Sequence, residues 1–254
     1  MVNDAGAFPK DGEIVTSNLP RLLDYEQIFS PIRSALHTRT FVIAQLGVSL
    51  DGRIALENGL SRGINGSSAL DHLHALRAEV DAVVVGAGTI AADDPQLNVR
   101  RVRGRNPARV VIDPSGRLGP EGRWLARDGA KRLLVSAAGR APHGAELVRL
   151  PLEEGVLPPD KILEALFERG LRRILVEGGA NTISRFIDAK CVDRLHILMA
   201  PVILGSGKPG LTLAPINSME AALRPPTDVY LLNGGEVVYD CDLRRQQGAA
   251  EPTD

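Results

Sequence analysis

The 254-residue sequence has few aromatic residues, few cysteines and almost no net charge, and each shortage excludes a class of protein. Aromatic residues make up only 4% of the chain, so we expect a core of Val, Ile, Leu and Ala. Cys191 and Cys241 lie far apart and form no CxxC pair, which argues against a thiolate zinc site and a disulfide scaffold. A net charge of −1 gives no general attraction to nucleic acid or to an anionic membrane.

Long apolar runs are also missing. No stretch is long enough to span a bilayer, and the first residues lack the basic start and apolar segment of a secretory signal. The composition, 44% hydrophobic and 24% charged, is ordinary for a globular protein. We therefore expect a cytoplasmic protein that acts on a small molecule and binds neither nucleic acid nor membrane.

Several catalytic motifs are absent. The chain contains no HExxH, no G-x-S-x-G elbow and no H-x-E…P-C-x-x-C pattern of a zinc deaminase. His72 and His74 are two residues apart on a predicted helix and do not share a face as metal ligands would, so no metal site is expected. GSGKPG at 205–210 lacks the first glycine of a P-loop and has Pro209 in place of its Ser/Thr, which favours a surface loop. Cofactor-based redox chemistry is the enzyme class that remains best supported.

Apolar strands alternate with amphipathic helices along most of the chain, which predicts an α/β fold with a mostly parallel central sheet and flanking helices. Two further strands flank NGG at 233–235 and predict an antiparallel C-terminal hairpin. Helices are expected around 22–29, after Ser67 or Ser68 as N-cap, around 162–167 and through 183–187. Strands are expected at 41–46, 81–85, 109–112, 133–135, 146–150, 173–176, 195–199, 228–232 and 236–241. We predict one domain over 40–245, an N-terminal extension over 1–39 and a tail over 246–254.

Two glycine turns directly follow predicted strands, GAGT at 86–89 and VEGG at 176–179. Ligands bind beyond the carboxyl ends of strands in such sheets, so both turns mark a ligand-facing edge. GAGTIA fits the dinucleotide fingerprint, but DDP at 93–95 ends the helix within two turns, which disfavours a Rossmann site and leaves another cofactor turn or a structural turn. VEGGANT opens a helix whose N–H groups could hold a phosphate, a plain tight turn being the alternative. Glu177 ends a buried strand and therefore needs partners.

A basic run follows the first turn, and a solvated loop is its simplest explanation because the chain is not basic overall. The run consists of Arg100, Arg101, Arg103, Arg105 and Arg109. Arg77 and Arg100 lie beside the predicted turns and could together hold one phosphate ester. Asp51 sits in an Asp-Gly turn, which favours a structural role over proton transfer.

Eight segments resemble the pyrimidine reductases of riboflavin biosynthesis and occur in the order typical of that family, over roughly residues 40–215. They are SLDGRIA, the turn at Ser61, HLHALRA, DAVVVGAGT, ADDPQLNVR, RVVID, LVEGGANT and VDRLHILMAPVILGSG. The resemblance implies a dihydrofolate-reductase-like fold, a homodimer and NADPH as cofactor. It also implies reduction of the ribosyl group of a 5-amino-6-(5-phosphoribosylamino)pyrimidine to the ribitylamino product, with hydride passing from nicotinamide C4 to the ribosyl C1′.

The same resemblance implies which residues form the site. Glu177 is expected to be catalytic and to face the ribityl or pyrimidine end, while Arg77 and Arg100 hold the substrate phosphate. The residues expected to contact substrate are Gln45, Ser61, Arg77, Leu97 and Arg100. The residues expected to contact NADPH are Gly47, Gly63, Thr89, Asp93, Gly178, Gly179, Ala180, Asn181 and Thr182, within a segment that continues to Arg185.

Two positions depart from the family pattern. Gln45 stands where bacterial bifunctional members usually carry a lysine. A neutral amide both donates and accepts, so either the deaminated or the undeaminated pyrimidine could be the substrate. Pro114 stands where a cofactor-contacting serine is often found, and it has no N–H or hydroxyl to donate. Since no deaminase motif is present, a separate chain is expected to deaminate. The alternatives are a reductase of the same fold acting on a pterin-like or folate-like substrate, and a nucleotide-binding protein without turnover.

Overall fold

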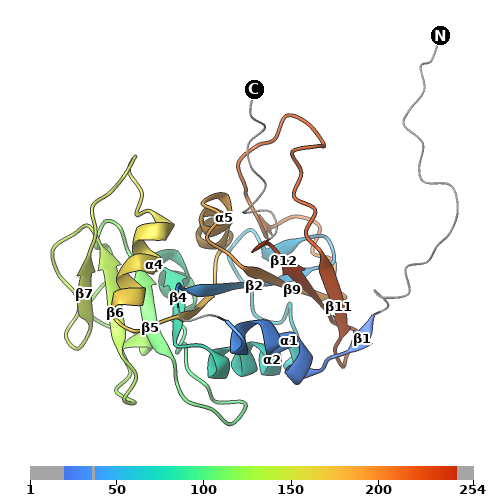
Figure 1. Ribbon diagram of the computed structural model, residues 1–254, viewed down its shortest axis with the longest axis horizontal. Coiled ribbons are helices and arrows are strands. Elements are labelled where there is room, and N and C mark those ends of the chain that lie inside the picture. Colours follow the sequence, from blue (N-terminus) through green and yellow to red (C-terminus); the bar gives the residue numbers. More distant parts are fainter. Residues whose placement is uncertain (1–19, 36–37, 245–254) are drawn as a thin grey trace, which may run out of the picture.

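The computed structural model describes residues 20–35 and 38–244. Ten strands form one twisted sheet in the order β1-β11-β12-β9-β2-β8-β4-β5-β6-β7 (Figure 1). The run from β9 to β7 is parallel throughout, and β12 pairs antiparallel with both β9 and β11. The predicted fold class, a mostly parallel sheet with an antiparallel C-terminal hairpin, is confirmed.

Helices separate many of the strands of the parallel run along the chain, and this alternation is the pattern from which the fold was predicted. Its strands are β2 (Phe41–Ser49), β4 (Ala82–Gly86), β5 (Ala108–Ile112), β6 (Arg132–Ser136), β7 (Glu146–Arg149), β8 (Arg173–Val176) and β9 (Arg194–Ala200). The hairpin is β11 (Thr227–Leu231) and β12 (Val237–Asp242), and β1 (Arg21–Leu22) adds to its outer edge. The helices are α1 (Tyr25–Arg33), α2 (Ser67–Glu79), α3 (Ala87–Asp93), α4 (Pro159–Glu168) and α5 (Ala180–Asp188), with a 3₁₀ turn over Arg123–Leu125. β3 (Arg53–Ala55) and β10 (Lys208–Pro209) form a separate antiparallel pair.

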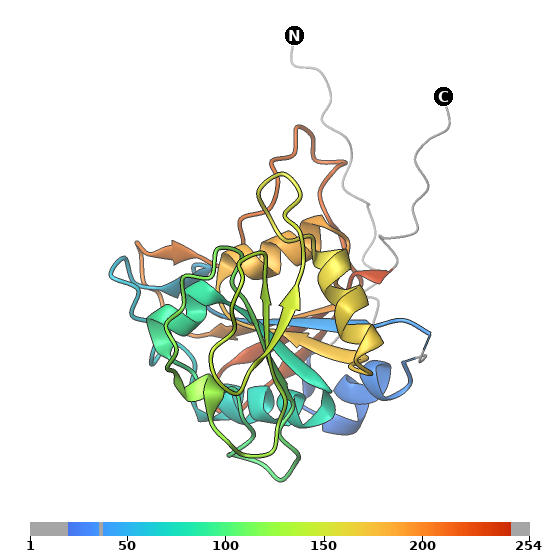
Figure 2. The same cartoon turned by 90° about the vertical axis from the view of Figure 1, so that its left-hand side faces the viewer.

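Helices cover both faces of the sheet, α1 and α2 on one side and α4 and α5 on the other (Figures 1 and 2). The period-2 alternation of β2 divides its side chains between the two cores. Ala44 and Leu46 lie in the core beneath α4 and α5, whereas Ile43 lies in the core beneath α1 and α2. Gln45 and Gly47 continue the row of Ile43, so they point to the α2 side at the carboxyl end of the strand.

The helix α1 begins later than the predicted helix over 22–29 and runs through Pro31. Asp24 sets its start, because Asp24 Oδ1 accepts the Glu26 N–H at 2.9 Å. Ile28 and Phe29 are buried in the core on the α2 side, so this part of the predicted N-terminal extension packs onto the sheet. Residues 1–19 and the predicted tail lie outside the described residues, and the division into 1–39, 40–245 and 246–254 stays a prediction.

The start of α2 also differs from the prediction. Its N-cap is Gly66, not Ser67 or Ser68. The carboxylate of Glu236, at the start of the distant hairpin strand, accepts the Gly66 N–H at 2.7 Å and the Ala69 N–H at 3.3 Å. A side chain brought by tertiary folding therefore satisfies the free N–H groups that a local serine was expected to satisfy.

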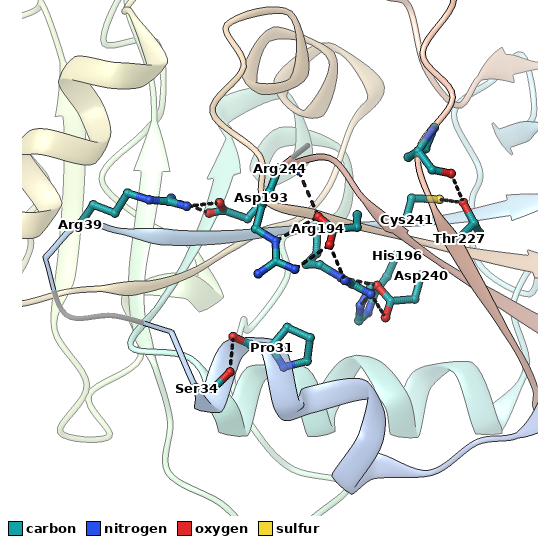
Figure 3. Close-up of polar contacts among 12 residues, drawn as sticks. Pro31, Ser34, Arg39, Asp193, Arg194, His196, Thr227, Asp240, Cys241 and Arg244 are labelled. Atoms are coloured by element: carbon teal, nitrogen blue, oxygen red, sulfur yellow. Dashed lines mark hydrogen bonds and ion pairs between the residues drawn. The ribbon is translucent and has the colours of Figure 1, made fainter. Parts of the chain in front are cut away.

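Ion pairs close the amino ends of the parallel strands. Asp193, before β9, accepts from the Arg39 guanidinium at 2.6 and 3.0 Å and from the Val42 N–H at 2.8 Å (Figure 3). Asp81, before β4, accepts from the backbone and side chain of Arg173 at 2.8 and 2.7 Å. Because each carboxylate joins one strand start to the next, this edge of the sheet is tied together rather than open.

A second buried group links β9 to the hairpin. Arg194 Nε donates to Asp240 Oδ1 at 2.8 Å, and His196 Nε2 lies 3.1 Å from the same oxygen (Figure 3). Asp242 pairs with Arg194 and with Arg244. The guanidinium and carboxylate charges balance within this group, which indicates a structural role. The opposite, carboxyl edge of the sheet is where a ligand site is expected.

Candidate functional site

A cavity of about 1090 Å³ lies at the carboxyl ends of β2, β8, β4 and β5. Its wall crosses the edge of the sheet, because Leu73 and Arg77 come from α2 on one face whereas Arg185 and Phe186 come from α5 on the other. Ligand pockets span roughly 300–1,000 Å³. This cavity has about the volume of two mid-sized pockets, so it can hold two ligands side by side.

The residues predicted from the sequence meet in this cavity, with one exception. Those predicted to contact substrate or to be catalytic all line it: Gln45, Ser61, Arg77, Leu97, Arg100 and Glu177. Those predicted to contact cofactor line it as well: Gly47, Gly63, Thr89, Asp93, Gly178, Gly179, Asn181 and Thr182. Ala180 begins α5 but is not part of the wall. The two glycine turns therefore share one site, as their positions after β4 and β8 indicated.

The two turns interlock through glycine and threonine. A Cβ on Gly178 would lie 2.5 Å from Thr89 Oγ1, and a Cβ on Gly86 would lie 2.5 Å from Thr182 Oγ1. Thr89 Oγ1 also accepts the Gly179 N–H at 3.0 Å. Each glycine thus makes room for the threonine of the other turn. The result is a closely packed floor beneath the first N–H groups of α5, a suitable place for a phosphate.

Glu177 finds its partner in Arg77. Arg77 Nε and Nη2 donate to the two carboxylate oxygens, each at 2.7 Å, and only 6% and 7% of the two side chains are exposed. Arg77 Nη1 donates to the Asn98 carbonyl at 3.1 Å. A bidentate pair of this kind fixes the carboxylate in direction as well as charge. Arg77 therefore orients Glu177, a role that the sequence did not suggest.

Arg100 is the cation next to this pair. Its Nη1 donates to Asn98 Oδ1 at 2.9 Å and no carboxylate contacts it among the described residues. Burial and the neighbouring guanidinium of Arg77 lower the pKa of Arg100, but a guanidinium keeps its charge in proteins. Leu97, three residues earlier, adopts a left-handed φ of +53° and is buried at the wall. Such a conformation in a bulky residue is kept only where its surroundings hold it.

Gln45 and Gly47 form the β2 side of the wall. Gln45 is 8% exposed, and its amide makes no hydrogen bond within residues 20–35 and 38–244, so it is available to a ligand. Gly47 has no room for a side chain, because a Cβ there would lie 2.0 Å from Asn65 Oδ1. Asn65 Nδ2 donates to the Leu198 carbonyl at 3.1 Å, which holds the amide over the glycine. Asn65 is a wall residue that the sequence did not predict.

Other wall residues were also missed. Lys208 belongs to the segment predicted as a surface loop, but β10 pairs with β3 and brings Lys208 to the cavity. Pro114 lines the cavity as expected, and Ser115 and Arg117 line it beside Pro114, so this turn still offers a hydroxyl and a cation. Nothing near these residues in sequence marks them, because their positions depend on strand pairing and turn geometry.

Arg109 departs from the predicted solvated run. It lies on β5 with 0% of its surface exposed, and its guanidinium contacts Asp128 and donates to the Ala126 carbonyl at 3.0 Å. Asp51 is outside the cavity wall, and its oxygens accept from Ser49 Oγ at 2.6 Å and from the Gly205 N–H at 2.7 Å. These bonds lower the pKa of Asp51 to about 2 and support the predicted structural role.

Positive charge dominates the cavity wall. The cations on it are Arg62, Arg77, Arg100, Arg117, Arg185 and Lys208, and the anions are Asp93 and Glu177. Since Glu177 is neutralised by Arg77, the remaining charge favours anionic, phosphorylated ligands. Within the part of the chain that the structure describes, no group of three or more His, Cys, Asp and Glu residues could hold a metal ion, and no helix has the length and apolar character needed to cross a bilayer.

Several known proteins are similar to this chain. The 2,5-diamino-6-ribosylamino-4(3H)-pyrimidinone 5′-phosphate reductase of Methanothermobacter thermautotrophicus is 36% identical over 197 residues, which cover 73% of this chain and 90% of that protein. The riboflavin biosynthesis protein RibD of Haemophilus influenzae is 34% identical over 194 residues, which cover 69% of this chain and 50% of that protein.

The fold has solved counterparts. The crystal structure of a diaminohydroxyphosphoribosylaminopyrimidine deaminase/5-amino-6-(5-phosphoribosylamino)uracil reductase from Thermotoga maritima superposes with a TM-score of 0.70 at 26% identity. The match covers 85% of this chain and 59% of that one, so the present chain spans little more than half of the bifunctional protein. The family model of the RibD C-terminal domain matches residues 40–224. This chain therefore belongs to the RibD C-terminal domain family, to which the riboflavin-biosynthesis pyrimidine reductases belong.

Proposed function

We propose that the protein is an NADPH-dependent reductase that converts the ribosyl group of a 5-amino-6-(5-phosphoribosylamino)pyrimidine to a ribitylamino group. The observation that carries the proposal is the single cavity, in which Gln45 and Arg100 share a wall with the interlocked turns around Thr89 and Gly178. One cavity for two ligands is what a reaction between a cofactor and a substrate needs, since it holds both in fixed relative positions.

The residues of the turns fit a nicotinamide dinucleotide. Gly178, with φ of +103°, brings the chain close to the cavity without a side chain, and the α5 N-terminus offers N–H groups for a pyrophosphate. When bound, NADPH supplies the hydride that the ribosyl C1′ accepts. The protein's own task is to orient the two ligands and to exclude water from the space between them.

The preference for NADPH over NADH requires a site for the 2′-phosphate. Ser115, Arg117 and Arg185 line the cavity beyond the interlocked turns, and Arg185 makes no ion pair within the described residues. A guanidinium bond to phosphate is worth about 1.5–3 kcal/mol. Arg117→Ala and Arg185→Ala are each expected to raise KM for NADPH by about tenfold or more without changing KM for NADH. Arg105→Ala, outside the cavity, is the matched control, and an equal effect on both cofactors would contradict the assignment.

The substrate end is assigned to the α2 side. Arg100, Ser61 and Lys208 offer one guanidinium, one hydroxyl and one ammonium to the phosphate of the substrate. Glu177 accepts hydrogen bonds from the ribosyl hydroxyls or the pyrimidine amino group, because both its oxygens keep a lone pair after pairing with Arg77. Glu177 is thus a fixed acceptor that aligns the sugar.

Gln45 bears on which pyrimidine is reduced. A relative of 36% identity that this chain spans almost fully is named for the undeaminated, diamino substrate, which favours that form here. The free amide of Gln45 could accept from the 2-amino group of that ring or donate to the carbonyl of the deaminated ring. Gln45→Glu is expected to strengthen the preference for the amino form, and Gln45→Lys to shift it toward the carbonyl form. The ratio of kcat/KM on the two substrates measures this, and an unchanged ratio in both variants would remove Gln45 from the assignment.

The decisive assay mixes purified protein with NADPH and each of three compounds, the diamino pyrimidine, its deaminated form and dihydrofolate. Oxidation of NADPH with either pyrimidine, together with mass-spectrometric detection of a ribitylamino product, supports the proposal. Oxidation with dihydrofolate alone would replace it by the pterin-like alternative. Binding of NADPH without turnover on any of the three would favour a nucleotide-binding protein. The predicted homodimer and cytoplasmic location are separate, and light scattering tests the first.

A further inference from the structure

His74 is a buried side chain of the cavity wall, next to the residues proposed to bind substrate. It lies on α2, one turn before Arg77, and 1% of its surface is exposed. His74 Nδ1 accepts the backbone N–H of Arg100 at 3.2 Å. An accepting ring nitrogen carries no hydrogen, so the neutral ring must carry its hydrogen on Nε2. His72, two residues earlier, instead packs its ring between Phe29 and His196.

The Nε2–H group of His74 is available to a ligand. Nε2 makes no hydrogen bond within residues 20–35 and 38–244, and it is not among the described polar atoms that are fully buried without a partner. Since His74 lines the cavity together with Arg77 and Arg100, a ligand in the cavity is the partner that this N–H could take. The wall thus offers an uncharged donor directly beside two guanidinium groups.

Several groups keep this ring neutral. Burial, together with the nearby charges of Arg77, Arg100 and Arg101, lowers the pKa of His74 to about 4 against the opposing charge of Asp71. The ring is therefore uncharged near neutral pH, and its Nδ1 stays an acceptor. Protonation would place a hydrogen on Nδ1 facing the Arg100 N–H, and the contact would be lost.

The contact of His74 completes a set that holds the segment 97–100. Arg77 holds the Asn98 carbonyl at 3.1 Å, and Asn106 Oδ1 accepts the Val99 N–H at 2.8 Å. Among the described residues, only His74 holds the backbone of Arg100. Since Leu97 starts this segment in a left-handed conformation, these contacts are what keep the segment in one arrangement.

We propose that His74 is a positioning and specificity residue for the phosphorylated substrate: its Nδ1 fixes Arg100, and its Nε2–H donates to an oxygen of the bound ribose phosphate. The proposal rests on the proposed function for the identity of the ligand. The tautomer of the His74 ring is independent of the proposed function, because it follows from the Arg100 contact alone. His74 thereby supplies a neutral hydrogen bond where two cations already supply charge.

Two substitutions separate the two nitrogens. His74→Asn keeps an amide oxygen near the Nδ1 position and loses the Nε2–H, whereas His74→Gln places an amide donor near Nε2 and loses the acceptor for Arg100. Each variant is expected to raise KM for the pyrimidine by about tenfold, the equivalent of one hydrogen bond to a charged group, and to leave KM for NADPH unchanged. His143→Asn and His143→Gln, on an exposed surface loop, are the matched controls.

A cycle with Arg100 tests the positioning role. Because His74→Gln acts through Arg100, combining it with Arg100→Ala is expected to weaken binding of ribose 5-phosphate no more than Arg100→Ala alone. The double variant His74→Asn/Arg100→Ala is expected to bind ribose 5-phosphate more weakly than either single variant. Additive losses in the first pair, or lowered stability with unchanged KM in both His74 variants, would overturn the positioning role.

The ring itself is observable without turnover. Long-range ¹H–¹⁵N spectra of the intact protein are expected to show His74 as the neutral Nε2–H tautomer at neutral pH, protonating only near a pH of about 4. Ribose 5-phosphate is expected to shift the Nε2 signal, with inorganic phosphate as the simpler probe. An imidazolium or an Nδ1–H tautomer at neutral pH would overturn the proposal. A probe that binds without moving Nε2 would overturn the substrate contact, whereas failure of all probes to bind would count against the proposed function and leave the tautomer result standing.

Discussion

The buried pair of Arg77 and Glu177 leads to a prediction that separates two roles for the arginine. If Arg77 serves chiefly to hold Glu177, its removal leaves a carboxylate buried and unpaired, and the whole protein loses stability. If Arg77 serves chiefly to hold a substrate phosphate, its removal raises KM and leaves the free energy of unfolding unchanged. The structure favours the first role, because both terminal contacts of the pair are 2.7 Å long.

The magnitude follows from burial. The two side chains are 6% and 7% exposed, so solvent screens their interaction weakly. Removing one partner of a buried pair costs about 3–5 kcal/mol, because the remaining charge is left without compensation. For a domain of this size each kcal/mol lowers Tm by about 2–4 °C, so Arg77→Met or Glu177→Gln is expected to lower it by roughly 6–20 °C, with the neutral Gln toward the small end. The double variant Arg77→Met/Glu177→Gln is expected to lose less than the sum of the single effects, since no charge remains buried.

Urea unfolding of the wild type, the two single variants and the double variant gives the coupling energy between Arg77 and Glu177 directly. Glu146→Gln is the matched control, because Glu146 pairs with Arg169 at 2.7 Å but its side chain is 51% exposed. That control is expected to change the unfolding free energy by about 1 kcal/mol or less. An Arg77→Met protein as stable as the control, or single effects that add in the double variant, would refute the reasoning. A raised KM in such a stable protein would restore the direct phosphate role.

Three further outcomes are expected. Gly178→Ala is expected to lower the unfolding free energy by about 1–2 kcal/mol or more, because its φ is +103° and the new Cβ meets Thr89. Gly179→Ala, whose Cβ would lie 3.7 Å from Thr89 Oγ1, is expected to be near neutral in the same urea titration. Burial alone would raise the pKa of Asp240, but His196 and Arg194 lower it to about 2. The stabilisation that Asp240 provides is therefore full above pH 3.8 and is lost as the pH falls toward 2. Asp240→Asn is expected to reduce the pH dependence of the unfolding free energy over that window. Glu236→Ala lowers the unfolding free energy by about 0.5–2 kcal/mol through the lost cap of α2, and a wild-type midpoint would remove that role.

Much of the fold could be predicted from sequence because its signals are local. The strands at 41–49 and 173–176 are short apolar runs bounded by turn residues, and the NGG turn places the final hairpin. The two glycine turns were recognisable because each directly follows such a run. Their joint position at one cavity then follows from the rule that parallel strands share a carboxyl edge.

The parts that could not be predicted depend on residues far apart in sequence. Glu236 caps α2 from 170 residues away, and nothing near Gly66 indicates that a carboxylate will arrive. Lys208 reaches the wall only because β10 pairs with β3. Arg77 and Glu177 were both placed in the site, but their mutual contact depends on how α2 packs against the end of β8. Sequence patterns thus located the site, and tertiary packing assigned partners within it.

The interlocked turns have a consequence for how this family can diverge. Gly86 faces Thr182 and Gly178 faces Thr89, each with room for a hydrogen but not for a methyl group. A larger residue at Gly86 is tolerated only if residue 182 becomes smaller at the same time, whereas at Gly178 the φ of +103° disfavours any side chain whatever its neighbour. We therefore expect positions 86 and 182 to change as a pair across many homologous sequences. A random library at the four sites is expected to retain folded clones mainly where position 178 stays glycine and a larger residue at 86 is matched by a smaller one at 182.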